Sequence, residues 1–242
     1  MSIHHSLDRL RAMRLAPLAE AIAHQLGNPD YQALSFEERV VVAVDKLCEH
    51  QEGRRLERGL KQAKLKVNAA LEGIDYRPGR GLDRSLIASL GDCAWVGKSA
   101  NVIVTGPTGV GKTHLGCALA QQAVRKGFTA KYLRLPRLLE DLEIAHQDGS
   151  LAKQRAALAR IDLLILDDWA VAPLTPRGRQ DLLELVDDRV GSGSVLITSQ
   201  LPVDQWHAFI GDPTIADAIL DRLVHSAHRI ELGGESMRKR KA

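Results

Sequence analysis

Apolar residues in the first part of the chain recur at helical spacing, which predicts amphipathic helices. The first run consists of Leu7, Leu10, Met13, Leu18, Ile22 and Leu26. We expect Pro17 to divide this run into two helices, because proline removes a backbone donor and clashes with the preceding turn. Ser35 and Glu38 have the spacing of a capping box and predict the start of another long helix. Residues 1–70 are therefore expected to form a small all-helical domain.

Residues 71–98 have the character of a connector. Residues 76–81, Y-R-P-G-R-G, are typical of a turn and mark the expected domain boundary. Trp95 and Val96 come shortly before the next apolar run. They would either wall an adenine pocket or pack in the core, and the sequence leaves both interpretations open.

From residue 99 onward, strand and helix patterns alternate. The expected strands are residues 101–105, 129–135, 163–166, 194–199 and 227–232, and the expected helices include 114–126, 151–160 and 175–190. Residues 163–166, L-L-I-L, are apolar throughout, which is typical of a strand buried on both faces of a parallel sheet. The alternation predicts an α/β fold in which helices cover both faces of a parallel sheet.

A glycine-rich stretch lies between the first of these strands and its helix. It matches the phosphate-binding pattern G-x-x-x-x-G-K-[ST] at every fixed position. Its residues are Gly106, Pro107, Thr108, Gly109, Val110, Gly111, Lys112 and Thr113, and His114 follows on the first helical turn. Glycines let backbone N–H groups surround an anion. We expect Lys112 to contact the β- and γ-phosphates of a nucleoside triphosphate, and Thr113 to bind Mg²⁺.

Polar residues at the ends of two later strands are candidates for the chemistry. Asp167 is expected to hold the metal, and Asp168 to orient or deprotonate the attacking water. The alternative is a pair of aspartates that begins a loop. Gln200 is expected to detect the γ-phosphate, unless it only ends a strand in a turn.

Arg222 stands on a helix that is otherwise lined with apolar residues. An arginine in that position can stabilise transition-state charge in a neighbouring subunit's site. It can equally form a surface ion pair of little energetic value beside Asp221. The residues alone do not decide between these two roles.

Positive charge is concentrated between residues 51 and 66, where six basic residues accompany two acidic ones. The basic residues are Arg54, Arg55, Arg58, Lys61, Lys64 and Lys66. Spacings of three and four place most of them on one helix face, where an anionic partner would relieve their repulsion. We expect this face to contact the backbone of duplex DNA, with a merely solvated face as the alternative. Residues 238–241, R-K-R-K, are expected to form a frayed basic tail.

The composition is that of a soluble globular protein, with 45% hydrophobic and 26% charged residues. No stretch approaches the roughly 20 apolar residues of a membrane span, so we expect no membrane contact. Cys48, Cys93 and Cys117 form no C-x-x-C pair, which argues against a disulfide framework or a zinc site. This cysteine usage suits the reducing cytoplasm.

Together these motifs resemble the IstB-like ATP-binding proteins. These are helper ATPases of a group of bacterial insertion sequences, and they are related to the DnaC-type helicase loaders. The resemblance is carried by G-P-T-G-V-G-K-T-H-L, L-L-I-L-D-D-W, I-T-S-Q-L-P, W-H, L-D-R-L-V-H and G-G-E-S-M-R-K. It covers nearly the whole chain, and the Ser-Gln-Leu-Pro and Trp-His combination is much narrower than the motifs shared by many nucleotide-binding enzymes.

The resemblance implies an AAA+ P-loop ATPase core at residues 99–242, preceded by a DNA-binding domain. The P-loop strand should lie between the strand before Gln200 and the last strand. The implied roles are ATP and Mg²⁺ binding for Lys112 and Thr113, metal binding for Asp167, water activation for Asp168, a sensor for Gln200 and an intersubunit arginine finger for Arg222. The implied assembly is a homo-oligomer that forms on duplex DNA with ATP and recruits or stimulates a cognate transposase.

Two departures from the family pattern modify this expectation. Asp168 stands where a glutamate is usual, which implies slow, switch-like hydrolysis. Little chain follows residue 232, so we expect the helical lid and its arginine to be missing and contacts between subunits to complete the site. Three other functions remain as alternatives: a DnaC-type helicase loader, a small-molecule P-loop kinase, and a nucleotide-binding protein without turnover.

Overall fold

The computed structural model describes residues 2–237 of the chain. The chain forms two compact units, Met1–Arg58 and Gly59–Ala242, so residues 59–98 belong to the same unit as the later strands. The ranges 1–70, 71–98 and 99–242 stay a prediction. The basic run expected at residues 238–241 lies outside the described residues. Within the described residues, no helix is both long and apolar enough to cross a membrane.

The first unit is helical, as the spacing predicts. It contains α1 (Ile3–Ala12), α2 (Ala16–Gly27), the 3₁₀ helix η1 (Pro29–Ala33) and the greater part of α3 (Phe36–Ala63). The break lies between Ala12 and Ala16, just before Pro17, which is in the first turn of α2, where a missing N–H costs nothing. The capping box also forms, since Glu38 N–H donates to Ser35 Oγ at 3.2 Å and Ser35 N–H donates to Glu38 Oε2 at 2.7 Å.

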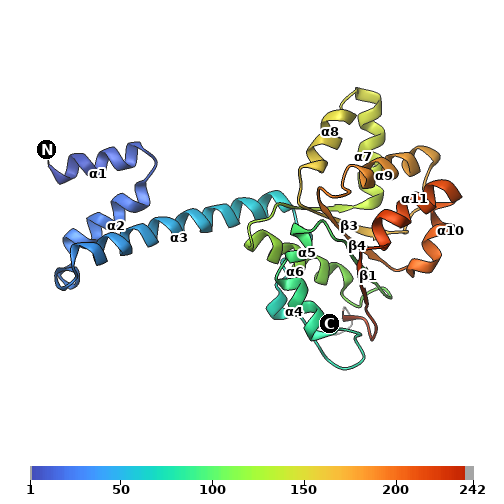
Figure 1. Ribbon diagram of the computed structural model, residues 1–242, viewed down its shortest axis with the longest axis horizontal. Coiled ribbons are helices and arrows are strands. Elements are labelled where there is room, and N and C mark those ends of the chain that lie inside the picture. Colours follow the sequence, from blue (N-terminus) through green and yellow to red (C-terminus); the bar gives the residue numbers. More distant parts are fainter. Residues whose placement is uncertain (1, 238–242) are drawn as a thin grey trace. The chain divides into compact units, whose positions relative to one another are not determined.

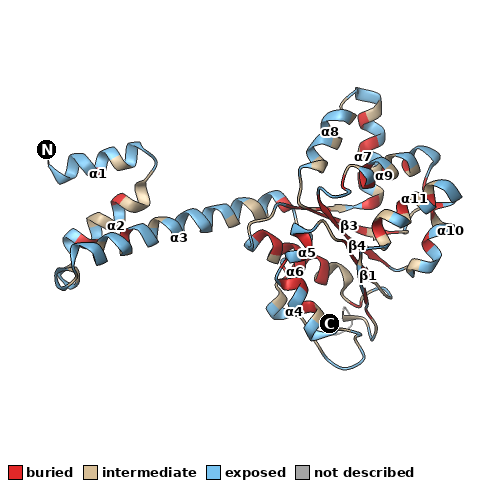
Figure 2. Cartoon of the chain, in the orientation of Figure 1, coloured by how far each residue is buried: buried red, intermediate tan, exposed pale blue. Residues whose placement is uncertain are grey.

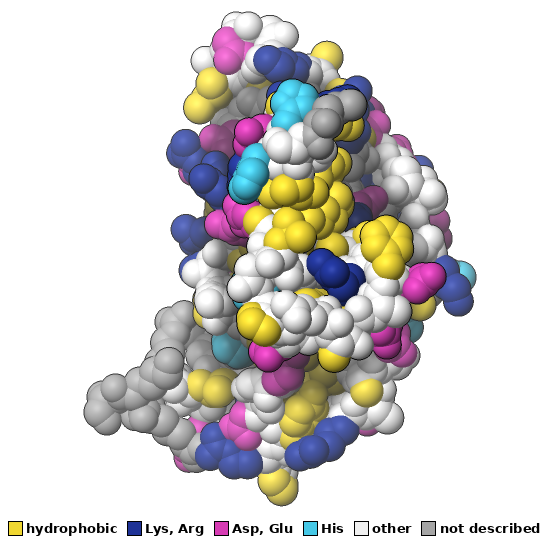
Figure 3. Space-filling model, turned by 90° about the vertical axis from the view of Figure 1, so that its left-hand side faces the viewer, with side chains coloured by type: hydrophobic (Ala, Val, Ile, Leu, Met, Phe, Trp, Pro, Cys, Tyr) yellow, Lys and Arg dark blue, Asp and Glu magenta, His cyan; other side chains and the backbone are white. Residues whose placement is uncertain are grey.

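This unit buries few apolar side chains. Among the described residues of this unit, the buried apolar ones are Leu7, Ala19 and Ala43, and most of the others are exposed (Figure 2). Several large apolar residues are exposed, namely Ile3, Met13, Leu26, Phe36, Val40, Val41 and Val44. Figure 3 shows hydrophobic side chains gathered on one face of the molecule. Exposed apolar groups in such numbers are typical of a surface that a partner covers.

The second unit is built on a parallel sheet with strand order β2-β3-β4-β1-β5, and Figure 1 labels β3, β4 and β1. The strands are β1 (Val102–Thr105), β2 (Ala130–Arg134), β3 (Leu163–Trp169), β4 (Ser194–Ser199) and β5 (His228–Glu231). All the expected strands are present. As the resemblance implied, β1 lies between β4 and β5.

Helices cover both faces of this sheet. They are η2 (Leu71–Gly73), α4 (Arg84–Gly91), α5 (Ala94–Gly97), α6 (Lys112–Arg125), α7 (Leu135–Asp148), α8 (Leu151–Ala159), α9 (Pro176–Asp187), η3 (Val203–Gln205), α10 (Trp206–Ile210) and α11 (Pro213–Val224). Figure 1 shows α4–α6 on one side of the sheet and α7, α9, α10 and α11 on the other. The α/β fold with a parallel sheet is therefore confirmed.

A hydrophobic core cluster lies between the sheet and α7, α9, α10 and α11. Trp169 of β3 and Trp206 of α10 are fully buried in it, with ring centroids 4.7 Å apart. Trp95 is buried elsewhere, and its indole N–H donates to the carbonyl of Leu90 at 2.9 Å. Of the two interpretations of Trp95 and Val96, the structure therefore supports packing in the core.

Candidate functional site

The glycine-rich stretch forms a loop from the carboxyl end of β1 to the amino end of α6. Gly106, Gly109 and Gly111 have φ angles of 142°, 87° and 98°, a region that residues with a Cβ rarely enter. The Lys112 ammonium donates to the carbonyls of Gly106 at 2.7 Å and Pro107 at 2.8 Å. The loop thus surrounds the end of its own lysine side chain, in the geometry of a phosphate-binding loop at a helix N-terminus.

Asp167 is the centre of a buried cluster of hydroxyl groups. Its side chain is 1% exposed, and Thr113 Oγ1 donates to Oδ1 at 2.9 Å. Tyr132 and Thr198 also donate their hydroxyl protons to its carboxylate. Burial, with the hydrogen bond to Asp167 as a second cause, raises the pKa of Tyr132, so the phenol stays a donor at all ordinary pH values.

This cluster fits the chemistry of a magnesium site. A carboxylate oxygen and a threonine hydroxyl oxygen lie next to each other at the edge of the phosphate-binding loop. Mg²⁺ prefers oxygen ligands and binds through one or two carboxylates together with substrate phosphates. When bound there, the ion would neutralise charge on the β- and γ-phosphates.

A basic residue from before the sheet also reaches Asp167. Lys66 Nζ lies 3.7 Å from Asp167 Oδ2, and the lysine side chain is 46% exposed. The sequence grouped Lys66 with the basic face of a helix, but α3 ends at Ala63 and Lys64 has a φ angle of 49°. Lys64 and Lys66 therefore lie beyond the helix, a correction to its expected length.

Asp168 lies in a bulge of β3. Pairing with β4 shifts its register between Leu166 and Trp169, and Asp168 has a φ angle of 62°. A bulge re-aims side chains that would otherwise alternate between the two faces of a sheet. Arg134, at the end of β2, donates from Nε to Asp168 Oδ2 at 2.6 Å. This hydrogen bond raises the pKa of Arg134 and holds the Asp168 carboxylate at the edge of the site.

Gln200 follows β4 and contacts the phosphate-binding loop directly. Thr108 Oγ1 donates to Gln200 Oε1 at 2.6 Å. A cavity of about 410 Å³ opens at this edge of the sheet, within the size range of ligand pockets. It is lined by Val67, Gly73, Thr108, Gly109, Gly111, Lys112, Thr113, His114, Asp167, Asp168, Thr198, Ser199, Gln200 and Met237. The structure thus brings together the loop, both aspartates and the glutamine.

Arg222 lies away from this cavity. It forms an ion pair with Asp187 and donates from Nη1 to the carbonyl of Ala218 at 2.7 Å. Its own carbonyl accepts from Asn101 Nδ2, at the amino end of β1, whereas the phosphate-binding loop follows the carboxyl end. Arg222 lines a different cavity of about 430 Å³. It therefore does not contact the phosphate-binding loop of its own chain.

Comparison with known proteins decides the family. Residues 8–242 match the family described as IstB-like ATP binding protein. The chain belongs to this family. It is 44% identical, over 99% of its length and 98% of the relative's, to an insertion sequence ATP-binding protein of Sinorhizobium fredii. It is 49% identical, over 84% of its length and 88% of the relative's, to the ATP-binding protein of insertion sequence IS1162 of Pseudomonas fluorescens.

Solved structures with the AAA+ fold match this IstB-like chain. The structure of DnaI matches 68% of this chain and 91% of that chain, with 20% identity and a TM-score of 0.59. The DnaC helicase loader matches 70% of this chain and 99% of that chain, with 19% identity and a TM-score of 0.55. With this fold, family and phosphate-binding loop, the IstB-like chain is an ATP-binding AAA+ ATPase, as the sequence predicted.

Part of the IstB-like sequence signature is structural. In L-L-I-L-D-D-W and W-H, the two tryptophans are Trp169 and Trp206, which pack against each other beneath the site. Trp206 Nε1 donates to the carbonyl of Leu201 at 2.9 Å, in the segment that follows Gln200. The narrow part of the signature thus supports the strand ends that carry Asp167, Asp168 and Gln200.

Sequence reasoning missed several side chains of this IstB-like site. Tyr132 and Thr198 come from β2 and β4, and only the register of the sheet brings them to Asp167. Arg80 and Met237 reach the phosphate-binding loop from irregular segments, where no periodicity marks them. Of these residues, only Thr198 could have been recognised from the sequence, because a buried polar side chain in an otherwise apolar strand is unusual.

Proposed function

We propose that this protein is a helper ATPase of transposition that binds duplex DNA with ATP and Mg²⁺, oligomerises on it, and recruits or stimulates a cognate transposase at the target. The observation that carries the proposal is family membership over residues 8–242 together with the assembled site around Lys112 and Asp167. The curated relatives are named as proteins of insertion sequences. Its expected place is the cytoplasm, where ATP and DNA are both present.

The proposed roles at the site follow from the geometry. Lys112 and the loop N–H groups bind the phosphates, Thr113 and Asp167 hold Mg²⁺, and Asp168 orients the attacking water. Gln200 bonds to Thr108 of the loop, so it can transmit the presence of the γ-phosphate to β4. Because Asp168 is one methylene shorter than glutamate and is engaged by Arg134, we propose slow, switch-like hydrolysis.

Two features support an oligomer. Arg222 lies in a cavity separate from the nucleotide site of its own chain, so a role in hydrolysis requires the site of a neighbour. The first unit exposes apolar side chains that another protein surface would cover, such as Phe36, Val40 and Val44 on α3. We propose that a second copy of the chain supplies one such surface and that the transposase binds the assembled oligomer.

Duplex DNA binding is proposed for the basic residues of α3 and its continuation. Arg54, Arg55, Arg58, Lys61, Lys64 and Lys66 are all exposed. Each phosphate contact adds roughly 0.9 to the slope of log affinity against log salt concentration. Replacing Arg54, Arg58 and Lys61 by alanine should reduce this slope by about 2 to 3 and weaken binding similarly for all sequences.

Fluorescence anisotropy with a labelled duplex, titrated with salt in the presence of ATP, measures this slope. Lys46→Ala is the matched control, because Lys46 lies on the same helix and pairs with Glu49 at 3.3 Å. Affinity that does not depend on salt, or a triple variant with the parent's slope, would refute the DNA surface. Electron microscopy with ATP and duplex DNA tests the assembly, and a strand-transfer assay with the cognate transposase tests the recruitment.

A helicase loader of the DnaC type is the second candidate, because the DnaC structure shares the fold. At 19% identity that likeness shows the fold alone. Two activity assays distinguish the two functions. A helper of transposition stimulates strand transfer by its transposase, whereas a loader places a replicative helicase on single-stranded DNA.

A further inference from the structure

Two irregular segments of the second unit contact the phosphate-binding loop. The first is the connector turn, residues 75–81, and the second is the strap, residues 232–237, which follows β5. Neither contains a residue of the nucleotide-binding motif. Each donates a hydrogen bond to a backbone carbonyl of the loop, the first from the Arg80 side chain and the second from the Met237 N–H, and the two segments also bond to each other.

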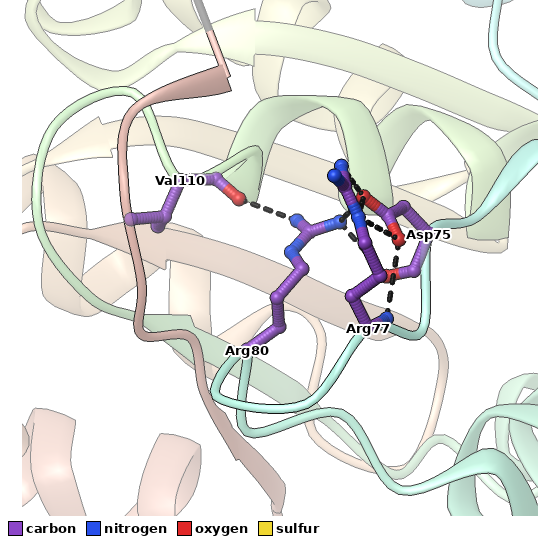
Figure 4. A network of polar contacts seen from close by, with 4 residues as sticks. All are labelled: Asp75, Arg77, Arg80 and Val110. Carbon is purple, nitrogen blue, oxygen red and sulfur yellow. Dashed lines mark hydrogen bonds and ion pairs between the residues drawn. The ribbon is translucent and has the colours of Figure 1, made fainter.

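Arg80 connects the connector turn to the loop, as Figure 4 shows. Its guanidinium donates from Nη2 to the carbonyl of Val110 at 2.6 Å and from Nη1 to the carbonyl of Asp75 at 2.8 Å. Nη1 also lies 3.7 Å from the Asp75 carboxylate, and the Arg80 side chain is 13% exposed. A guanidinium fixed at both ends of its fork in this way has little freedom to move.

Asp75 orients Arg80 but is held by a second arginine as well. Arg77 donates to the Asp75 carboxylate from Nε and Nη2 (Figure 4). The hydrogen bonds from Arg77 hold the pKa of Asp75 at about 2, so the carboxylate stays ionised near neutral pH. Arg77 itself is 57% exposed, and it bonds to Asp75 rather than to the loop. Arg77 and Arg80 therefore both contact Asp75, but of the two only Arg80 bonds to the phosphate-binding loop.

The strap runs along the loop and bonds to it. Met237 N–H donates to the carbonyl of Gly109 in the loop at 2.9 Å. Leu232 N–H donates to the carbonyl of Thr105, the last residue of β1, at 2.8 Å. Gly233 N–H donates to the carbonyl of Arg80 in the connector turn at 3.1 Å. A Cβ at Gly106 would lie 2.1 Å from the carbonyl oxygen of Leu232, and one at Gly109 would lie 2.2 Å from Ser236 Oγ. These two glycines of the motif are thus required for the strap as well as for an anion.

The contacts fix the direction of the loop's N–H groups. In a trans peptide the carbonyl and the N–H point to opposite sides of the same rigid plane. The carbonyl of Val110 shares its plane with the N–H of Gly111, and the carbonyl of Gly109 shares its plane with the N–H of Val110. Fixing the two carbonyls therefore also fixes the two N–H groups, which in a phosphate-binding loop are donors to the anion.

We propose that Arg80 is a positioning residue for nucleotide binding, which with the strap pre-organises the phosphate-binding loop from within the same chain. This inference rests on the proposed nucleotide site. The sequence led us to expect that contacts between subunits complete the site, and support of the loop from within the chain adds to that expectation. Pre-organisation raises affinity because the ordering is complete before the ligand arrives.

The test compares Arg80→Ala and Arg80→Lys with Arg77→Ala as the matched control. The readouts are the dissociation constants of a fluorescent ATP analogue and of ADP, measured by anisotropy, and the kcat and KM of phosphate release. Arg80→Ala should weaken binding of both nucleotides about tenfold, with kcat at saturating ATP changed less than about threefold. Arg80→Lys should be intermediate, because an ammonium lacks the guanidinium's fork of donors. Arg77→Ala should bind like the parent.

Two outcomes would overturn the proposal: unchanged nucleotide affinity in Arg80→Ala, whatever its kcat, or an equal loss of affinity in Arg77→Ala. Thermal unfolding without nucleotide identifies a variant that fails to fold, and if Arg80→Ala does, Arg80→Lys decides by the same criteria. Failure of the parent protein to bind nucleotide would instead refute the proposed function.

The strap has an independent test in its backbone N–H. Met237→Pro removes the donor to Gly109, whereas Met237→Ala removes the side chain and keeps the donor. Met237→Pro should bind the fluorescent nucleotide several-fold more weakly than Met237→Ala. Equal affinities in the two variants would contradict a role for this hydrogen bond.

Discussion

The ammonium of Lys66 lies 3.7 Å from the carboxylate of Asp167, the residue proposed to hold Mg²⁺. A lysine and a metal ion attracted to the same carboxylate repel each other. Lys66 comes three residues after the end of the helix that carries Arg54, Arg58 and Lys61. The ion pair therefore joins the segment after the proposed DNA-binding helix to the proposed metal site.

Replacing Lys66 by alanine is expected to lower the Mg²⁺ concentration that gives half-maximal ATP hydrolysis. An ion pair with an exposed partner is worth roughly 0.2–1 kcal/mol, which corresponds to a shift of about 1.4- to 5-fold. Magnesium titrations of phosphate release at fixed ATP measure the shift, with Lys61→Ala as the control. A higher Mg²⁺ requirement in Lys66→Ala would show that the lysine assists the metal rather than competing with it.

The same variant separates the two roles assigned to Lys66. If its ammonium is engaged with Asp167, Lys66→Ala should leave the salt slope of duplex binding unchanged. Lys61→Ala should reduce that slope by about 1. Equal reductions in the two variants would place Lys66 on the DNA surface, as the sequence first indicated.

Arg134 is expected to restrain Asp168. Asp168→Asn should lower kcat about 10²- to 10⁴-fold, the range for loss of a general base. Arg134→Ala should instead raise kcat a few-fold, because it frees the carboxylate from the 2.6 Å hydrogen bond. Single-turnover phosphate release measures both, and Arg137→Ala is the control, since Arg137 pairs with Glu140 and Asp141. A loss in Arg134→Ala as large as that in Asp168→Asn would make Arg134 part of the catalytic machinery.

Arg222 should act on the site of a neighbouring subunit. Arg222→Ala and Lys112→Ala are each expected to abolish most hydrolysis, since one removes the finger and the other the phosphate ligand. In a mixture, some sites combine an intact loop with an intact arginine, so part of the activity should return. Phosphate release at several mixing ratios with DNA present gives the measurement. Absence of any recovery in mixtures that still assemble would count against the intersubunit role.

Asn101 is expected to contribute strongly to stability. Its side chain is 6% exposed, accepts from Val195 N–H at 2.9 Å and donates to the carbonyls of Arg222 and Leu223. Asn101→Ala leaves these buried groups without the partner and should cost about 1–3 kcal/mol. Asn101→Asp should cost more, because a carboxylate would then face two carbonyl oxygens. Urea unfolding followed by circular dichroism compares them, and equal stability of Asn101→Asp and the parent would contradict this account.

Local patterns predicted the parts of the fold that depend on nearby residues. Residues 163–166 are apolar without interruption, and the loop from Gly106 to Thr113 has a fixed spacing, so both are visible in the sequence. The length of α3 was overestimated, because no glycine or proline follows Ala63 to signal its end. α10 was not predicted, since its five residues are too few to show a period.

The remainder of the site depends on contacts between residues distant in sequence. Tyr132 reaches Asp167 because β2 and β3 pair in one particular register, which no local pattern encodes. Arg80 lies in a turn where its neighbours, Gly79 and Gly81, indicate only flexibility. Its contact with Val110 arises when the connector turn packs against the loop. The phosphate-binding role of the motif was therefore predictable from the sequence, whereas the side chains that hold Asp167 and the loop in place were not.

The strap has a consequence for the order in which the protein is synthesised. The nucleotide-binding motif leaves the ribosome long before residues 232–237, and β5 must pair with β1 before the strap can lie against the loop. A nascent chain that has emerged only as far as α11 carries every residue of the motif without the strap. We expect tight nucleotide binding to begin only after β5 and the strap have emerged. ATP binding would then not stabilise an incomplete chain during translation.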